Sequence, residues 1–138
     1  MSAYEDRADI TDVLVRYATG IDRRDWPLFR TVFTDDCALD YGDIGSFDGV
    51  DAVTGFMDQA HAMAGHTLHR LTNVAVDVEG DSAHARTYVD ALIFAADNAS
   101  GVNAVGFYDD DLVRTPAGWR IARRRFTTVR VSTVGDPS

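Results

Sequence analysis

His69 is the side chain in this sequence best suited to proton transfer. An imidazole titrates near neutrality and can take a proton from a carbon beside a carbonyl or allylic centre. The apolar neighbours Leu68, Leu71 and Val74 predict a partly buried position on a strand. Burial lowers the pKa of a histidine, whereas a nearby carboxylate raises it and fixes the tautomer. The residues alone leave two interpretations open: a general base, or a strand histidine bonded to a backbone carbonyl.

Asp22 and Tyr17 belong to the end and to the apolar stripe of one predicted helix. An anion is unfavourable at a helix C-terminus, so Asp22 needs a partner such as a histidinium, unless it is a solvated or salt-bridging acid. Tyr17 is expected to be buried, with its phenol bonded either to protein or to a ligand in a cavity. Five helical residues advance about 140° beyond one turn. The two side chains can therefore serve one pocket only if the helix ends before Asp22 or if they approach from different sides.

Asp90 and Arg124 are charged residues within strand-like segments. Charges are seldom placed among buried neighbours unless they are paired or functional, so we expect a partner for Asp90 from the arginine-rich segment RIARRRF. Alternation puts Arg124 on the same face as Arg120, with Arg123 and Arg125 on the other face. If Arg124 faces a cavity, it could bind a leaving group or an oxyanion.

Other catalytic motifs are absent from the sequence. There is no Gly-rich phosphate loop, GxSxG elbow, HExxH motif or nucleotide-binding fingerprint. We interpret His66 as structural, and His61 and His84 have no acidic partner nearby in the sequence. The histidines and acids are not spaced as a metal site, and Cys37 is the only cysteine. We therefore expect neither a metal nor a cofactor.

Charge and composition exclude several kinds of partner. The 138 residues carry 22 acidic and 13 basic side chains, a formal charge of −9, and such a surface repels phosphate backbones and anionic lipid. We therefore expect no nucleic-acid partner and no membrane partner. No run reaches the roughly 18 apolar residues of a membrane helix, and charged residues are mixed through residues 1–20, where a signal peptide would be apolar. The sequence predicts a soluble, cytoplasmic protein.

Apolar spacing predicts three helices in the first half of the chain. A stripe with helical period predicts a helix over about 5–21. Asp25 can cap a short second helix. A third helix is expected over about 50–64, capped by Asp48 or Asp51. Two short extended pieces, CALDY and SFDG, lie between the second and third helices.

From residue 66 onward the pattern is that of β-strands. Four long segments are rich in β-branched and aromatic residues: LHRLTNVAVDV, SAHARTYVDALIFAA, NAVGFYDDDLVR and GWRIARRRFTTVRV. Helices followed by antiparallel strands indicate an α+β fold with the helices on one face of the sheet. Strands this long must curl in so small a protein, which predicts a cone with an internal apolar cavity, a usual small-molecule site. We expect one domain over residues 1–138, with the terminal GDPS frayed.

Several motifs together resemble a known family. They are YATGIDRRDWPLFRTVFTDDCALDYG, HTLHRLTN, ARTYVDA, YDDDLVR and GWRIARRR, which span about residues 4–131. In order and spacing they resemble the SnoaL-like branch of the nuclear-transport-factor-2-like (NTF2-like) superfamily, and within it the scytalone dehydratase, hexachlorocyclohexane dehydrochlorinase and bile-acid 7α-dehydratase group. The resemblance implies a cone-shaped, cystatin-like α+β fold with three helices on a strongly curved, mostly antiparallel sheet. This fold hosts several reaction types as well as non-catalytic domains.

The resemblance also implies a site. Asp22 and His69 match the Asp–His dyad of that group, Tyr17 matches a polar residue five before the Asp, and Asp90 and Arg124 are the nearest matches to a strand acid and a late arginine of the pocket. The implied activity is that of a cofactor-independent lyase. It would remove water or another β leaving group from a small apolar molecule such as a steroid, terpenoid or polyketide. His69 would take the proton, Asp22 would orient the imidazole, and Tyr17 with Arg124 would stabilise the oxygen or leaving group.

Two alternatives stay open. Asp40 and Tyr17 resemble the proton shuttle and the oxyanion donor of ketosteroid isomerases, which would make the chain an isomerase or a polyketide cyclase. In that case Asp40 would contact the substrate. The other alternative is a ligand-binding domain without chemistry.

The last strand suggests self-association. Its residues Phe126, Val129 and Val131 stand beside several arginines, a composition typical of interfaces. The clustered arginines need acids, which a neighbouring subunit could offer from the run Asp109 to Asp111. Related dehydratases are commonly trimers and other members dimers, so we expect a homo-oligomer, a trimer or a dimer.

Overall fold

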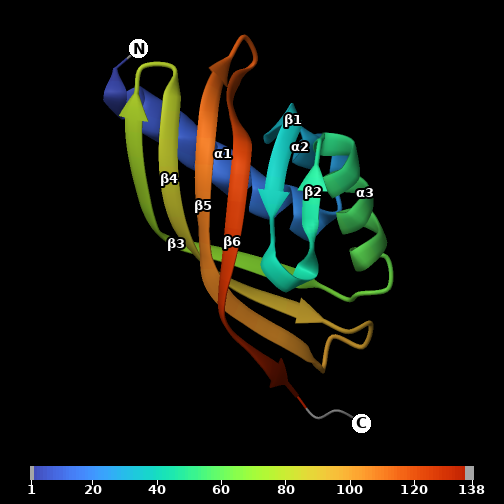
Figure 1. Ribbon diagram of the computed structural model, residues 1–138. Helices are drawn as coiled ribbons and strands as arrows, with labels where there is room; N and C mark the ends of the chain where they lie inside the picture. The colour runs from blue at the N-terminus through green and yellow to red at the C-terminus, as the bar shows by residue number, and fades with distance from the viewer. Residues whose placement is uncertain (1, 136–138) are drawn as a thin grey trace.

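Three helices pack against one strongly bent sheet (Figure 1). The computed structural model describes residues 2–135, so the predicted fraying of residues 136–138 lies outside the described part. The helices are α1 (Ala3–Arg23), α2 (Trp26–Arg30) and α3 (Val50–His61), with a short 3-10 helix η1 (Gly42–Ile44). The strands are β1 (Phe33–Asp40), β2 (Ser46–Asp48), β3 (Thr67–Glu79), β4 (Ser82–Phe94), β5 (Gly101–Thr115) and β6 (Gly118–Val134).

The strand order in the sheet is β2-β1-β6-β5-β4-β3. β1 pairs parallel to β6, and every other neighbouring pair is antiparallel. The four long strands β3 to β6 follow one another in the chain and are neighbours in the sheet. The predicted α+β architecture, with helices on one face of a mostly antiparallel sheet, is confirmed.

The N-terminal helices form where the sequence predicts them. Ser2 caps α1 by accepting a hydrogen bond from the backbone N–H of Glu5, and the apolar stripe of this helix is buried. α1 ends at Arg23, slightly beyond the predicted end at about residue 21, so Asp22 lies within the last turn. Asp25 caps α2 by accepting from the backbone N–H of Leu28, as predicted.

The predicted cap of α3 is wrong. Neither Asp48 nor Asp51 caps this helix; its N-cap is Gly49, at φ 90°, with no side-chain hydrogen bond. Asp48 is held in β2 opposite Ala38, and the glycine makes the sharp turn from strand to helix. α3 also ends at His61, earlier than residue 64.

Bulges bend the sheet and change which side chains face inward. In β3 the register shifts between Thr72 and Ala75, so inward residues have odd numbers before the shift and even numbers after it. In β6, Arg123 pairs with Asp111 while Ile121 pairs with Leu112, which leaves Ala122 as the extra residue.

The bulge at Ala122 overturns one prediction. Strict alternation put Arg124 on the face of Arg120, but the buried residues of this part of β6 are Trp119, Ile121 and Arg124. The extra residue reverses the alternation between the two arginines. Arg124 therefore shares the core-facing side with the tryptophan and the isoleucine.

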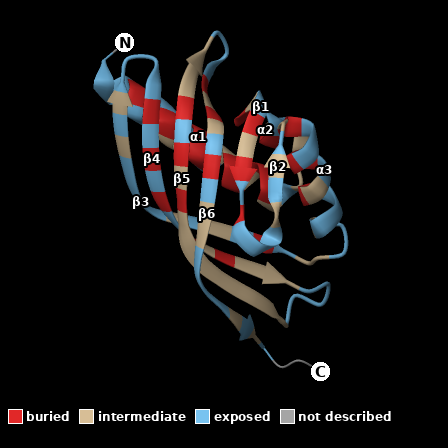
Figure 2. Ribbon diagram, viewed as in Figure 1, coloured by how far each residue is buried: buried red, intermediate tan, exposed pale blue. Residues whose placement is uncertain are grey.

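Buried residues lie on α1 and on the parts of the strands that face it, whereas the far ends of β5 and β6 are partly exposed (Figure 2). The core joins the stripe of α1 to aromatic residues of α2 and β1 and to the inner face of the sheet. Within residues 2–135, no helix has the length and apolar character needed to cross a membrane.

Candidate active site

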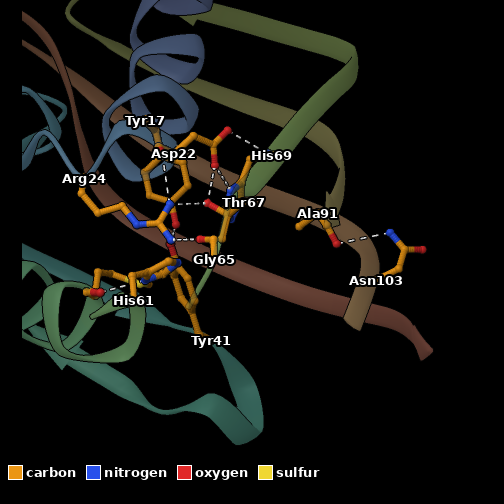
Figure 3. Close-up of polar contacts among 11 residues, drawn as sticks. Tyr17, Asp22, Arg24, Tyr41, His61, Gly65, Thr67, His69, Ala91 and Asn103 are labelled. Carbon is orange, nitrogen blue, oxygen red and sulfur yellow. Dashed lines mark hydrogen bonds and ion pairs between the residues drawn. The ribbon is translucent and has the colours of Figure 1, made fainter. Parts of the chain in front are cut away.

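Asp22 and His69 form a closely bonded pair between α1 and β3 (Figure 3). His69 Nδ1 lies 2.7 Å from Asp22 Oδ1, and the backbone N–H of His69 donates to Asp22 Oδ2 at 2.9 Å. The hydroxyl of Thr67 also donates to Asp22 Oδ1, at 2.9 Å. Both carboxylate oxygens are thus occupied by donors from the start of β3, which fixes the carboxylate relative to the imidazole.

Several hydrogen bonds stabilise the negative charge of Asp22 at the end of α1. Burial alone would raise the pKa of Asp22, but the hydrogen bonds from the side chain and backbone of His69 and from Thr67 hold it below its usual range. Asp22 is therefore ionised near neutral pH. The carboxylate accepts from Nδ1 of His69, so in the neutral imidazole the proton lies on Nδ1 and Nε2 is the accepting nitrogen.

His69 faces an apolar cavity of about 210 Å³ between α1, η1, α3 and the inner face of the sheet. Its side chain is only 7% exposed. Among the hydrogen bonds of the described residues, none uses His69 Nε2, so this nitrogen is free to accept a proton. Most of the cavity wall is apolar, with Ile21, Phe56 and Ala91 from three different elements. The polar groups on the wall are three tyrosines and two histidines: Tyr17, Tyr41, Tyr108, His61 and His69.

Tyr17 reaches this cavity from a different side than Asp22. Its ring meets that of His69 edge to face, with 6.3 Å between centroids, although both Tyr17 and Asp22 belong to α1. Asp22 lies in the last turn of the helix and bonds to Nδ1 of the imidazole. The two side chains therefore approach one histidine from two directions, one of the two arrangements that the sequence left open.

Three phenols gather beside the histidine. The hydroxyls of Tyr17 and Tyr41 lie 2.7 Å apart, and the ring centroid of Tyr108 lies 5.7 Å from that of Tyr17 and 6.4 Å from that of Tyr41. Burial raises the pKa of each phenol, and the positive charge of Arg124 only partly opposes this rise. The three phenols therefore stay protonated and can donate hydrogen bonds.

Arg124 lies behind the phenols. Its guanidinium is 4.2 Å from the ring centre of Tyr17 and 3.8 Å from that of Tyr108. It forms a bidentate salt bridge with Asp110, with N–O distances of 2.7 and 2.9 Å, and both side chains are buried. Burial raises the pKa of the Asp110 carboxyl, and the pair with Arg124 opposes that rise. Arg124 thus faces the interior and contacts two aromatic rings that line the cavity, those of Tyr17 and Tyr108.

Asp90 and Asp40 do not join this group. Asp90 lies on the outer face of the sheet, where it accepts from Arg70 at 2.8 Å and from Asn103 at 2.5 Å, so the prediction of a partner from the arginine-rich strand is wrong. Asp40 is half-exposed, and its nearest basic group is Arg125, at 3.8 Å. Side chains alternate along strands, so the neighbours of these acids point inward in their place.

The acids that face the arginine cluster come from the same chain. Asp110 pairs with Arg124, and in the register of β5 and β6 Asp109 and Asp111 lie opposite Arg125 and Arg123. The sequence assigned this role to a neighbouring subunit. The antiparallel hairpin of β5 and β6 explains the difference, because it brings the acidic run directly beside the arginines.

His61 lines the cavity, although its place in the sequence predicted no role for it. It lies on the last turn of α3, and its Nδ1 is 2.7 Å from the carbonyl oxygen of Met57. Burial lowers the pKa of His61, as does the nearby charge of Arg24. Its i+4 spacing from Met57, a residue of the predicted apolar stripe, could have indicated that His61 faces the interior. Tyr41, Tyr108 and Asp110 were likewise missed, since their roles depend on contacts between strands.

The chain belongs to the SnoaL-like domain family, whose sequence pattern matches residues 2–125. An uncharacterised protein of Mycobacterium tuberculosis is 37% identical over 121 residues, which cover 86% of this chain and 82% of the relative. The predicted branch of the superfamily is thereby confirmed.

Solved structures share the fold. An NTF2-like protein with a cystatin-like fold from Novosphingobium aromaticivorans is 27% identical, with a TM-score of 0.81 over 91% of this chain and 83% of that chain. A scytalone dehydratase-like protein of the same organism is 21% identical, with a TM-score of 0.83 over 91% and 85% of the two chains. A hexachlorocyclohexane dehydrochlorinase is 18% identical, with a TM-score of 0.86 over 96% and 90%. The predicted NTF2-like, cystatin-like fold is confirmed.

Proposed function

We propose that the chain is a cofactor-independent lyase that removes water, or another β leaving group, from a small apolar molecule. One observation carries the proposal: His69 presents a free Nε2 to an apolar cavity while its Nδ1 is bonded to the Asp22 carboxylate. An imidazole oriented in this way is a general base, and the carboxylate stabilises the imidazolium that forms.

The proposed reaction uses groups on the cavity wall. His69 Nε2 takes the proton from the carbon beside the activating group, and the electron pair of that C–H bond forms the C=C bond as the C–O bond to the leaving group breaks. The imidazolium then returns the proton to the departing hydroxide, which leaves as water. The hydroxyls of Tyr17 and Tyr41 share one hydrogen bond, so one of the two keeps its proton for a substrate oxygen on which negative charge develops, and the buried cation of Arg124 strengthens this donor.

The cavity favours a compact substrate. Its volume of about 210 Å³ exceeds only modestly the roughly 150 Å³ of an engineered cavity that holds benzene. One or two rings of a terpenoid or polyketide fit this volume, while a steroid could place only part of its ring system inside. The proposed substrate is thus a small ring compound with one oxygen near the tyrosines.

The alternative based on Asp40 gains no support from the geometry. Asp40 does not contact the cavity, and its side chain is 51% exposed on the other side of β1. Asp22→Asn and Asp40→Asn are therefore a matched pair for turnover assays on a substrate found by screening lipophilic ring compounds. We expect Asp22→Asn to lose about 100-fold or more in kcat/KM, and Asp40→Asn to keep the activity of the parent. A large loss in Asp40→Asn alone would favour the isomerase or cyclase.

A ligand-binding domain without chemistry is the remaining alternative. It predicts that the screened compounds bind with no product formed by the parent protein. Mass spectrometry of bound compounds before and after incubation separates this outcome from catalysis. We further propose that the protein works in the cytoplasm as a homo-oligomer, with a small molecule as its partner rather than a nucleic acid or a membrane.

A further inference from the structure

Arg24 lies next to the Asp22–His69 pair without touching the cavity. It is the C-cap of α1 and has left-handed backbone angles, φ 55° and ψ 34°. Such a position favours glycine because a side chain there is strained. A strained non-glycine residue beside a site points to a use for its side chain.

The guanidinium of Arg24 bonds to three acceptors from three segments (Figure 3). It donates to the backbone carbonyl of Asp22 at 3.0 Å, to the hydroxyl of Thr67 at 3.1 Å and to the carbonyl of Gly65 at 2.5 Å. None of these is a carboxylate side chain. Arg24 therefore joins the end of α1 to the segment before β3 and to the first residue of β3.

The hydrogen bond from Arg24 to Thr67 fixes the direction of the hydrogen bond between Thr67 and Asp22. A hydroxyl has one proton to donate and lone pairs to accept. Because the N–H of Arg24 occupies the accepting side, the single proton of Thr67 is directed to Asp22 Oδ1, 2.9 Å away. A chain of donors thus runs from Arg24 through Thr67 to Asp22, and Asp22 in turn holds His69.

We propose that Arg24 is a positioning residue, which holds the Asp22 carboxylate against His69 through Thr67. This inference rests on the proposed function, in which His69 is the base. Arg24 acts through other residues and does not contact the substrate cavity.

The test follows the imidazole nitrogens of the ligand-free protein by NMR during a pH titration. Arg24→Gly removes the side chain and relieves the backbone strain, and Arg23→Gly is the control, because Arg23 is an exposed neighbour on the same helix end. In Arg24→Gly we expect the Nδ1 proton signal of His69 to weaken, because Thr67 and Asp22 are no longer held in place. Arg24→Lys keeps the charge but lacks the fork of donors that reaches all three acceptors, so it should not restore the His69 signal.

An unchanged Nδ1 signal of His69 in Arg24→Gly would overturn the proposal. If Arg24→Gly does not fold, the His69 signal of Arg24→Lys decides, and its full retention overturns the positioning role. The readout does not depend on turnover. A weakened Nδ1 signal in Arg24→Gly together with full activity of His69→Ala would therefore reject the lyase and leave the placement by Arg24 standing.

Discussion

At the residue scale, Asp22 stabilises the fold only while it is ionised. Its carboxylate accepts three hydrogen bonds from the start of β3, two from His69 and one from Thr67. Those bonds offset the cost of burying the negative charge and of placing it at the negative end of the α1 dipole. The same contacts that orient the imidazole also join the first helix to the sheet, so the pH dependence of stability reports on the site.

The lowered pKa of Asp22 gives a prediction with a definite sign. The ionised carboxylate contributes stability above its unfolded pKa of about 4, and this contribution is lost as the pH falls through the lower folded-state pKa. We expect the protein to be about 1–3 kcal/mol more stable than Asp22→Asn at neutral pH, with the difference shrinking below about pH 4. Urea unfolding of both proteins across this range measures it. A difference that does not change with pH would contradict the account.

The buried pair of Asp110 and Arg124 gives the second prediction. Removing one partner leaves a buried charge alone, so Asp110→Ala should cost about 3–5 kcal/mol. The double change Asp110→Leu with Arg124→Met should recover most of this loss, because it removes both charges and keeps apolar volume. Urea unfolding of the two variants checks the expectation, and a double variant as unstable as the single one would refute it.

At the scale of elements, the segment before β3 sets the position of His69. Gly65 donates its backbone N–H to the carbonyl of Phe94, and a Cβ at Gly65 would overlap the carbonyl oxygen of Ala95 and the side chain of Asn98. The glycine therefore permits close contact between this segment and the link from β4 to β5. On its other side, Gly65 accepts the bond from Arg24.

Gly65→Ala should destabilise the protein by about 1–3 kcal/mol, because the methyl group meets backbone that cannot move freely. Gly55→Ala is the matched control, since it lies in α3 with open space around its Cβ and should stabilise by up to about 1 kcal/mol. Thermal unfolding of both variants tests the contrast. Equal effects of the two substitutions would show that the close contact is not required.

The elements show where sequence patterns suffice and where they do not. The spacing of apolar residues predicts α1, and alternation predicts the four long strands, because both patterns follow from local geometry. The bulge at Ala122 leaves no mark in the alternation, so the orientation of Arg124 relative to Arg120 could not be deduced. The pairing of Asp22 with His69 came from the family resemblance. The contact of Tyr17 with Tyr41 joins a helix to the end of a strand, and no local pattern contains it.

At the scale of the whole molecule, the sheet presents an outer face that the helices do not cover. Tyr88 and Val129 are 48% and 69% exposed, and an outer groove lies between them and Phe107. Among the arginines of β6, Arg124 pairs with Asp110 of the same chain and Arg125 lies 3.8 Å from Asp40, whereas Asp109 is bonded to Arg86. The exposed apolar residues are the main reason to expect self-association.

The predicted homo-oligomer should therefore respond to added salt in a definite way. An association through apolar side chains should survive high ionic strength, whereas one through ion pairs should weaken. Light scattering at micromolar concentration, with and without added salt, measures the mass. Tyr88→Asp combined with Val129→Asp should reduce the mass to one chain. A mass of about 15 kDa for the parent protein would contradict the prediction.

The central claim is that His69 takes the substrate proton, and its most direct test is the turnover of His69→Ala. The control is His84→Ala, whose side chain is half-exposed among acids on the outer face of the sheet. On a compound that the parent protein converts, the account predicts a fall in kcat/KM of about 10²–10⁴-fold for His69→Ala and none for His84→Ala. Turnover by His69→Ala at the rate of the parent would contradict the account.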